Sequence, residues 1–286
     1  MITGAAGQLG YELQRTAPKG TPVVAVDIEQ LDLTAPDAVE AFVAAHQPSV
    51  IINGAAYTAV DRAEEQPTLA YAVNVAAAAT LAQSAARHGA RMIQISTDFV
   101  FGGATGRPWR PDDMTAPESV YGTTKRDGER AVLDALGPQA LVIRTAWLYS
   151  AHGGNFVKTM LRLMRERDDV RVIADQIGTP TWANSLARTL WAAVARPHVA
   201  GVLHWTDAGV AGRYDFAVAI QEEALALGLL TRAVPVSAIT TDDYPTPARR
   251  PSYSVLDKTD TTRALGETPR HWRANLRQML GELTDA

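Results

Sequence analysis

A phenol and an ammonium group stand four residues apart in Tyr121-Gly122-Thr123-Thr124-Lys125. This spacing places both groups on one face of a helix. A phenol with a pKa near ~10 is a poor acid–base catalyst at neutral pH, and a neighbouring cation lowers that pKa toward the working range. An apolar run upstream ends in Ser96-Thr97-Asp98, which puts a hydroxyl at the carboxyl end of a strand, where open α/β folds bind ligands. We interpret Tyr121, Lys125 and Thr97 as a catalytic set, although a Tyr-x-x-x-Lys pattern alone is more often surface decoration.

The chain opens with glycines at three-residue intervals, Gly4, Gly7 and Gly10. Glycine there permits a tight turn, close approach of the backbone to a pyrophosphate, and close packing of the next helix. The spacing departs from the commoner G-x-G-x-x-G fingerprint, and a plain turn is the alternative. An apolar run then ends in Asp27, whose carboxylate would accept hydrogen bonds from an adenosine ribose or cap the strand end. Together these features favour a dinucleotide-binding site.

The elements that must position these residues alternate along the first half of the chain. Short β-branched runs, typical of strands covered on both faces, lie at 23–26, 50–53, 92–96 and 141–145. Alanine-rich helical segments lie between them, at 11–16, 36–46, 68–88 and 121–136. This order predicts an α/β fold with a doubly wound, Rossmann-type parallel sheet. Only Met1 and Ile2 precede the glycine-rich turn, so we expect a very short first strand.

The pattern loosens after about residue 150. We expect helices at 155–167, 184–195, 214–227 and 271–283, strands at 170–174 and 202–205, and an extended proline-rich loop at 244–251. We therefore divide the chain into a dinucleotide-binding domain, 1–150, and a smaller, interleaved C-terminal substrate-binding lobe, mainly 151–286. Later segments, roughly 176–200, are expected to return to the first domain.

Composition narrows the class of protein further. The 286 residues carry a net charge of −4, with no basic excess for nucleic acid, and no cysteine for disulfides, Cys-based zinc sites or thiol nucleophiles. The N-terminus does not have the pattern of a signal peptide. The longest apolar stretch, 69–86, contains Asn74, Gln83 and Ser84, which favours a buried helix over a membrane span. We expect a cytoplasmic protein with no membrane or nucleic-acid partner.

The glycines, Thr97 and the Tyr121/Lys125 pair resemble the extended short-chain dehydrogenase/reductase superfamily. Within it, the chain is most similar to the dTDP-4-dehydrorhamnose reductase family. The strings that carry this closer resemblance are NGAAYTAVDRAE at 53–64, STDFVFGG at 96–103, RTAWLY at 144–149, NFVKTM at 155–160 and YPTPA at 244–248. The resemblance covers essentially the whole chain.

The resemblance implies reduction of dTDP-4-dehydro-β-L-rhamnose to dTDP-β-L-rhamnose with NADPH or NADH. Tyr121 would protonate the C4 oxygen of the sugar, Lys125 would lower the pKa of Tyr121 and hold the nicotinamide ribose, and Thr97 would hydrogen-bond the reacting group. The implied cofactor contacts are Gly4, Gly7, Gln8, Leu9, Gly10, Asp27, Asp32, Leu33, Ala56, Tyr57 and Thr58, with Tyr121 and Lys125. The implied substrate contacts are Thr58, Thr97, Asp98, Trp147 and Arg250.

Several of these implied roles have alternatives. The indole of Trp147 would give the sugar an apolar face, unless it is a core residue. Arg250 would contact the diphosphate or form a structural salt bridge. Asp27 should repel a 2′-phosphate and favour NADH, whereas the family accepts NADPH and often both.

Some members of the family hold Mg²⁺ with glutamates at a homodimer interface. Glu12 and Glu282 occupy two of those positions, but Asn184 stands at the third. The sequence therefore leaves both the metal and the homodimer open.

Two other classes of function compete with a reductase. One is a nucleotide-sugar 4-epimerase or 4,6-dehydratase on the same fold, but a dehydratase needs a glutamate after Asp98 and Phe99 stands there. The other is a non-catalytic regulatory subunit on this fold. The complete set of Thr97, Tyr121 and Lys125 argues against that second reading.

Overall fold

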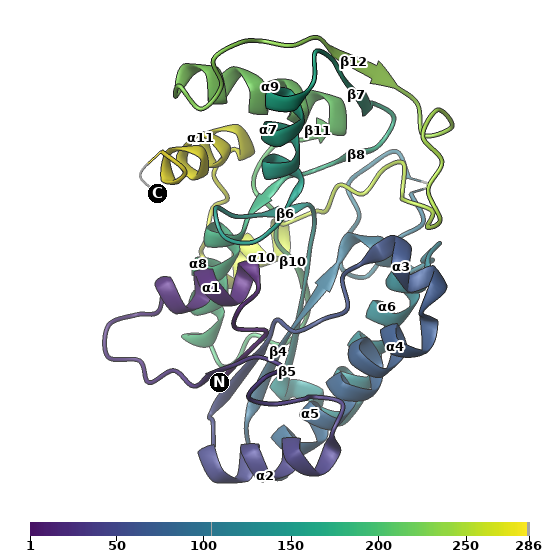
Figure 1. Ribbon diagram of the computed structural model, residues 1–286. Coiled ribbons are helices and arrows are strands. Elements are labelled where there is room, and N and C mark those ends of the chain that lie inside the picture. The colour runs from purple at the N-terminus through teal and green to yellow at the C-terminus, as the bar shows by residue number, and fades with distance from the viewer. Residues whose placement is uncertain (104, 285–286) are drawn as a thin grey trace.

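The computed structural model describes residues 1–103 and 105–284. A six-stranded, wholly parallel sheet runs through its larger half in the order β10-β5-β4-β3-β1-β2 (Figure 1). In chain order its strands are β1 (Ile2–Thr3), β2 (Ala25–Val26), β3 (Val50–Asn53), β4 (Arg91–Thr97), β5 (Ala140–Thr145) and β10 (Gly201–His204). The α/β class and the doubly wound parallel sheet expected from the sequence are confirmed.

Helices cover both faces of the sheet because neighbouring strand residues point to opposite sides. Ile52 and Ile93 pack with helices α1 (Gln8–Arg15), α8 (Ala183–Val194) and α10 (Thr259–Leu265). Their neighbours Ile51 and Met92 pack instead with α2 (Pro36–His46), α5 (Ala77–Arg87) and α6 (Val120–Leu136). Strands buried on both sides read as continuous apolar runs, which is why the sequence located them.

The helical run before β4 is not uniform. It consists of α4 (Pro67–Tyr71), a π-helical turn at Ala72–Ala76, and α5, with the short helix α3 (Val60–Glu65) just before it. By length and composition Pro67–Arg87 could cross a membrane, but half of its most apolar window is buried inside the protein, where α5 packs against α2 and α6. The run thus forms part of the core of the fold.

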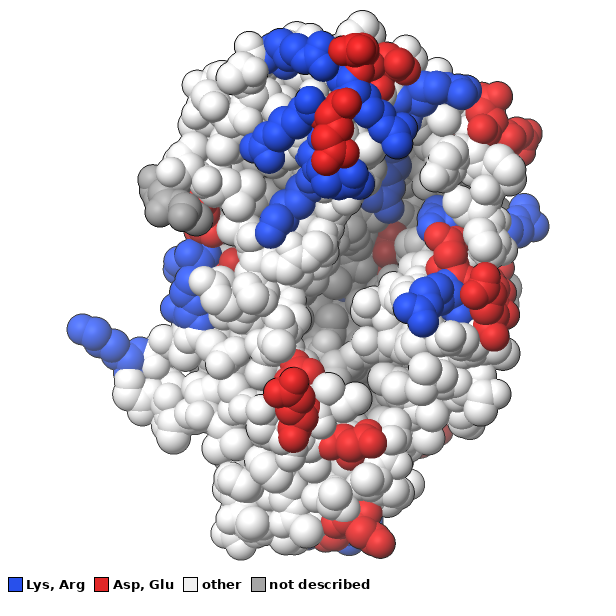
Figure 2. Space-filling view, viewed as in Figure 1, with Lys and Arg blue, Asp and Glu red and all other residues white. Residues whose placement is uncertain are grey.

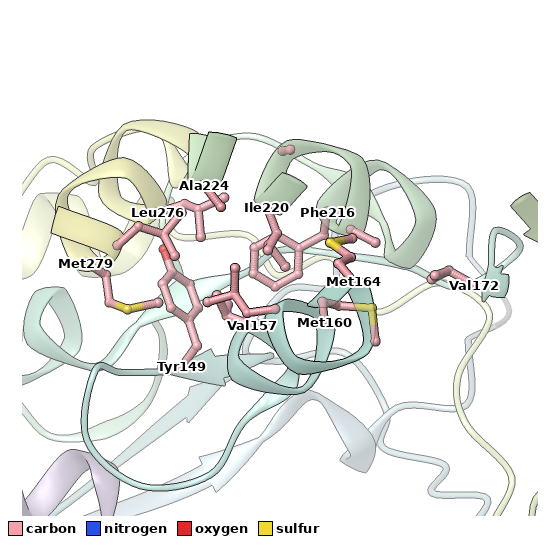
Figure 3. Packing of buried hydrophobic residues seen from close by; sticks show 14 of the residues in the cluster. Tyr149, Val157, Met160, Met164, Val172, Phe216, Ile220, Ala224, Leu276 and Met279 are labelled. Atoms are coloured by element: carbon pink, nitrogen blue, oxygen red, sulfur yellow. The ribbon is translucent and has the colours of Figure 1, made fainter. Parts of the chain in front are cut away.

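A second apolar core lies beyond the carboxyl ends of the strands. It is built by α7 (Phe156–Glu166), α9 (Arg213–Ala226) and α11 (Trp272–Glu282), which enclose the fully buried ring of Tyr149 (Figure 3). Three two-stranded pairs complete this part: β6 (Leu148–Tyr149) with β9 (Thr181–Trp182), β8 (Ile177–Gly178) with β11 (Ala211–Gly212), and β7 (Val170–Ile173) with β12 (Val236–Ile239). The chain crosses back to the sheet through α8 and β10, so the two cores interleave in sequence.

Candidate functional site

The glycine-rich turn is shaped by contacts that leave no room for side chains. Gly4 has φ +67°, and a Cβ there would lie 2.8 Å from the Ala55 nitrogen. A Cβ on Gly10 would lie 2.1 Å from the Gly4 carbonyl oxygen, so this glycine lets α1 pack closely on the turn. Helix α1 starts after the exposed Gly7 with no side chain capping it. Its first N–H groups therefore remain available to an anion such as a pyrophosphate.

Asp27 braces this turn from the end of β2. Its Oδ2 accepts a hydrogen bond from the Ala6 backbone at 2.8 Å, and its Oδ1 accepts one from Ile28. Asp32 is exposed, and hydrogen bonds from Thr34 lower its pKa. Neighbouring Leu33 is half-buried against the core on this side of the sheet. These residues line the sheet edge where the sequence places the adenosine half of the cofactor.

The loop after β3 contains Ala56, Tyr57 and Thr58, and it is held by a residue that the sequence analysis did not assign to the site. The buried Asn74 accepts a hydrogen bond from the Tyr57 backbone at 2.8 Å and donates to the Tyr57 carbonyl and to Thr124. It lies in the π-helical turn, a feature often found at functional sites. The signal in the sequence was an asparagine in an alanine-rich helix.

Thr97, Tyr121 and Lys125 come together at the carboxyl end of β4. Thr97 is the last residue of that strand, and Tyr121 and Lys125 lie in the first turns of α6, which Ser119 caps. A hydrogen bond joins Thr97 to Tyr121. Burial raises the pKa of the phenol to about 12, and the Asp98 carboxylate raises it further, against the effect of Thr97. The phenol is therefore protonated at neutral pH.

Burial is the largest cause of this raised pKa, and the expected effect of Lys125 in the opposite direction stays a prediction. The Lys125 ammonium donates to the Ile95 carbonyl at 2.7 Å and is nearly inaccessible to solvent. Burial lowers its own pKa to about 8, while the carboxylate of Glu129 opposes that shift. Glu129 in turn forms a buried, two-bond ion pair with Arg144. Neither member of this supporting pair was singled out from the sequence.

Asp98 is a buried carboxyl beside the catalytic threonine. Its Oδ1 accepts from Thr97 at 3.1 Å, while its Oδ2 has no hydrogen-bond partner among the described residues. Burial raises its pKa to about 6, against the opposing effects of Ser254, Thr97 and the charge of Arg213. One oxygen is thus left free for a ligand hydroxyl.

Trp147 stands two residues past the end of β5 with a backbone in the left-handed region, φ +47°. Such a conformation costs a non-glycine residue ~1–3 kcal/mol and is concentrated at functional sites. The Arg213 guanidinium carbon lies 3.9 Å over the indole ring, and a Cβ on Gly178 would lie 2.6 Å from the indole Cε2. Arg213 and the Gly178 backbone thus both pack against the indole. The apolar face that we expected Trp147 to offer the sugar stays a prediction.

Arg250 forms the salt bridge that was one of the two alternatives for it. Its two terminal nitrogens bind the Asp61 carboxylate at 3.0 and 2.7 Å, and one of them also binds Thr246. The Arg250 interaction lowers the pKa of Asp61. The pair joins the proline-rich loop to α3 and leaves the guanidinium largely occupied.

Glu12 and Glu282 are joined through Arg15 in the single chain. Glu12 is fully buried, and its oxygens accept from Arg15, Ser150 and Asn184 at 2.8–3.0 Å. Arg15 also binds Glu282 at 2.8 Å, so a guanidinium already links the two carboxylates. Within residues 1–103 and 105–284, no group of three His, Asp or Glu side chains could hold a metal. The Mg²⁺ contact of Glu12 and Glu282, which was expected at a homodimer interface, stays a prediction.

Figure 2 shows a hollow across one face of the molecule, between the sheet and the α7–α9–α11 core, with basic side chains crowding the upper rim. Both acidic and basic groups are visible inside or beside the hollow. The glycine-rich turn, the end of β4 and Trp147 all belong to elements that meet between these two parts. The arrangement suits an anionic ligand and a proton donor.

Comparison with known proteins fits this geometry. The family described as RmlD substrate binding domain matches residues 1–285. A dTDP-4-dehydrorhamnose reductase of Aggregatibacter actinomycetemcomitans is 41% identical over 286 residues, 98% of this chain and 97% of the relative. A probable dTDP-4,6-dihydroxy-2-methyloxan-3-one 4-ketoreductase of Streptomyces antibioticus is 43% identical, covering 100% of this chain and 96% of the relative. A crystal structure of dTDP-4-dehydrorhamnose reductase from Bacillus anthracis in complex with NADP has TM-score 0.93 and 34% identity, with 98% of each chain covered.

Proposed function

The chain belongs to the dTDP-4-dehydrorhamnose reductase family, and on that premise we propose which of its residues perform the reaction. It is an oxidoreductase of dTDP-rhamnose biosynthesis. Its substrate is a nucleotide sugar, dTDP-4-dehydro-β-L-rhamnose, and its product is dTDP-β-L-rhamnose. We also propose a cytoplasmic location and, for residues 151–286 apart from the segments that return to the sheet, the role of a substrate-binding lobe.

The residues at the glycine-rich turn fit a nicotinamide dinucleotide, NADPH or NADH, which when bound supplies the hydride for C4 of the sugar. The N–H groups of Gln8 and Leu9 would bind the pyrophosphate at the uncapped start of α1, beside Gly7, whose own N–H donates to the Gly4 carbonyl at 3.1 Å. Asp27 faces the adenosine ribose, and its negative charge favours NADH over NADPH. A relative binds NADP, so this preference is one of degree.

Tyr121 is the proton donor in this proposal. Reduction of the C4 carbonyl needs a proton on the oxygen, and the neutral phenol of Tyr121 holds one at neutral pH. Thr97, hydrogen-bonded to the phenol, orients it toward the carbonyl. Lys125 remains mostly cationic at pH 7, binds the nicotinamide ribose and stabilises the phenolate that forms when the proton leaves. The cluster of these three side chains, with Thr97 and Lys125 buried and Tyr121 partly buried, is the observation that carries the mechanism.

Substrate contacts surround that cluster. We propose that Thr58, from the exposed end of the Ala56–Thr58 loop, and Asp98, with its free oxygen, bind hydroxyls of the sugar. Trp147 would meet the sugar with the part of the indole that Gly178 and Arg213 leave open. The proposal leaves Arg250 as a brace of the loop around it.

A second candidate is a 4-ketoreductase that acts on a different dTDP-linked keto sugar. The relative from Streptomyces antibioticus, 43% identical, carries such a description. Both candidates use the same proton donor and differ only in the sugar that fits beside it. Parallel assays with the two keto sugars separate them.

The mechanism is tested by replacing Tyr121 with Phe. Loss of a general acid typically lowers turnover ~10²- to 10⁴-fold, while NADPH and NADH affinity should stay within about threefold because the phenol contributes little to cofactor binding. Tyr71→Phe on exposed α4 is the matched control and should keep full activity. Unchanged turnover in Tyr121→Phe would remove Tyr121 from the mechanism.

A further inference from the structure

Arg213 is a charged side chain in the cleft with no polar partner. It is the first residue of α9 and lies half-buried, with its guanidinium stacked on Trp147 at 3.9 Å and near the ring of Phe156 at 5.3 Å. Its backbone N–H donates to the Gln176 carbonyl. Across residues 1–103 and 105–284, no acceptor hydrogen-bonds the guanidinium and no carboxylate lies within ion-pair distance of it.

The guanidinium of Arg213 has N–H donors to spare. Arginine has five N–H donors and keeps its charge under ordinary conditions, and no nitrogen of Arg213 is among the fully buried, unpaired atoms, so its free donors remain open to a ligand. Burial lowers the pKa of Arg213 to about 10; the Asp98 carboxylate opposes this shift, and the neighbouring charge of Arg250 adds to it. Stacking on two aromatic rings fixes the plane of the fork but satisfies none of its donors.

The other charged groups near Arg213 do not offer the same free hydrogen-bond donors. Arg250 already donates hydrogen bonds to Asp61 and Thr246. Asp98 has a free oxygen of its own, yet it makes no ion pair with Arg213. The free oxygen of Asp98 is thus an acceptor, the guanidinium of Arg213 is a donor, and the two lie near each other without direct contact. This arrangement suits a ligand that offers both a hydroxyl and an anionic group.

We propose that Arg213 binds the diphosphate of the nucleotide-sugar substrate, in the role that the sequence offered to Arg250. The inference rests on the proposed function, since it takes a nucleoside-diphosphate sugar as the ligand. A guanidinium fork matches the geometry of phosphate oxygens and donates two parallel hydrogen bonds to them. With Arg213 on the diphosphate and Asp98 on a sugar hydroxyl, the sugar would be held across the end of β4, next to Tyr121.

This assignment gives the left-handed backbone of Trp147 a structural role. The strained residue holds the indole against Gly178, and the indole in turn presents a flat face on which the guanidinium lies. Trp147 is then a platform for the anion-binding residue in addition to a contact for the sugar.

The test measures binding by calorimetry, with dTDP and with thymidine as probes. Arg213→Gln should weaken dTDP binding roughly 10- to 100-fold, because charged hydrogen bonds of this kind contribute about 1.5–3 kcal/mol. Arg213→Lys should lose less, since it keeps the charge without the fork. Thymidine and NADPH affinities should stay within about twofold for both variants. Arg249→Gln removes an exposed charge from the neighbouring loop and should leave dTDP binding unchanged.

Three results would overturn the inference. The first is dTDP affinity in Arg213→Gln within twofold of the wild type. The second is an equal loss for thymidine and dTDP, which would make Arg213 a structural support of the nucleoside pocket. The third is an Arg249→Gln variant that loses as much dTDP affinity as Arg213→Gln. Turnover of the wild-type protein, measured on the same preparation, distinguishes failure of the Arg213 proposal from failure of the proposed function. If the wild type has normal turnover and Arg213→Gln binds dTDP as tightly as the wild type, only the role of Arg213 is rejected. If the wild type neither reduces the keto sugar nor binds dTDP, both proposals are rejected.

Discussion

Replacing Asp98 with Asn should make the protein more stable at neutral pH while lowering its activity. The carboxyl is 2% exposed, and burial raises its pKa from 3.8 to about 6. Asparagine keeps one oxygen that can accept the hydrogen bond from Thr97. In place of the second oxygen it carries an NH2 group, and that second oxygen of Asp98 has no hydrogen-bond partner among the described residues. The substitution therefore removes a buried charge at little cost in hydrogen bonds.

The sign and size of the effect follow from proton linkage. Because the folded-state pKa of Asp98 lies above the unfolded value, the folded state is favoured at low pH and loses stability as pH rises through the folded pKa. Each pKa unit is ~1.4 kcal/mol, so the charge costs about 3 kcal/mol above pH 6. Asp98→Asn should match the wild type near pH 4 and gain up to about 3 kcal/mol by pH 7.5.

Urea unfolding followed by circular dichroism, at several pH values between about 4 and 8, measures this difference. Asp113→Asn is a control of opposite sign, because its ion pair with Arg107 lowers the pKa of Asp113 to about 2 and its charge stabilises the fold above pH 4. The reasoning fails if Asp98→Asn is no more stable than the wild type at pH 7.5, or if its gain does not change with pH. Turnover of the keto sugar should fall at least tenfold in the same variant, since the free oxygen would become a donor.

Three further outcomes are expected. Asp27→Ala should raise the ratio of NADPH to NADH efficiency several-fold, because a negative charge near the ribose is removed; an unaltered ratio in steady-state kinetics would argue against contact with the ribose. EDTA should leave turnover within twofold of the untreated enzyme, because Arg15 already neutralises Glu12; restoration of lost activity by Mg²⁺ would contradict that geometry. Asn74→Ala should raise the KM for the cofactor by releasing the Tyr57 backbone from its two hydrogen bonds, whereas Asn74→Asp, which keeps the acceptor, should raise that KM less. An equal rise in KM for both variants would show that Asn74 acts only through packing.

Elements that are buried on both sides could be predicted closely from the sequence. Strand β3 and helix α2 have the expected bounds, 50–53 and 36–46, because an apolar run and a proline at the first helical position mark them locally. Strand β2 is only Ala25–Val26, although 23–26 was expected, because its partner β1 has two residues to pair with. The π-helical turn at 72–76 was not predictable, since hydrogen bonds from Asn74 to a distant loop accompany it.

In the candidate site, too, local features could be predicted from the sequence, whereas features that depend on distant elements could not. Tyr121 and Lys125 share a helix, so their spacing alone placed them together. The protonation of Tyr121 depends on burial by other elements, which the local argument from a neighbouring cation could not include. Arg213 joins the site from a helix far along the chain. Nothing in its neighbours in sequence indicates that Trp147 would hold it in place.

The most direct test of the central claim is the loss of reduced-nicotinamide absorbance when enzyme, cofactor and dTDP-4-dehydrorhamnose are mixed, with the product identified by chromatography. The account predicts stoichiometric cofactor oxidation and dTDP-rhamnose with wild-type protein, with NADPH and NADH compared side by side, and loss of nearly all of this signal in Tyr121→Phe. Folded wild-type protein that consumes neither cofactor, or a Tyr121→Phe variant that makes dTDP-rhamnose at the wild-type rate, would contradict it.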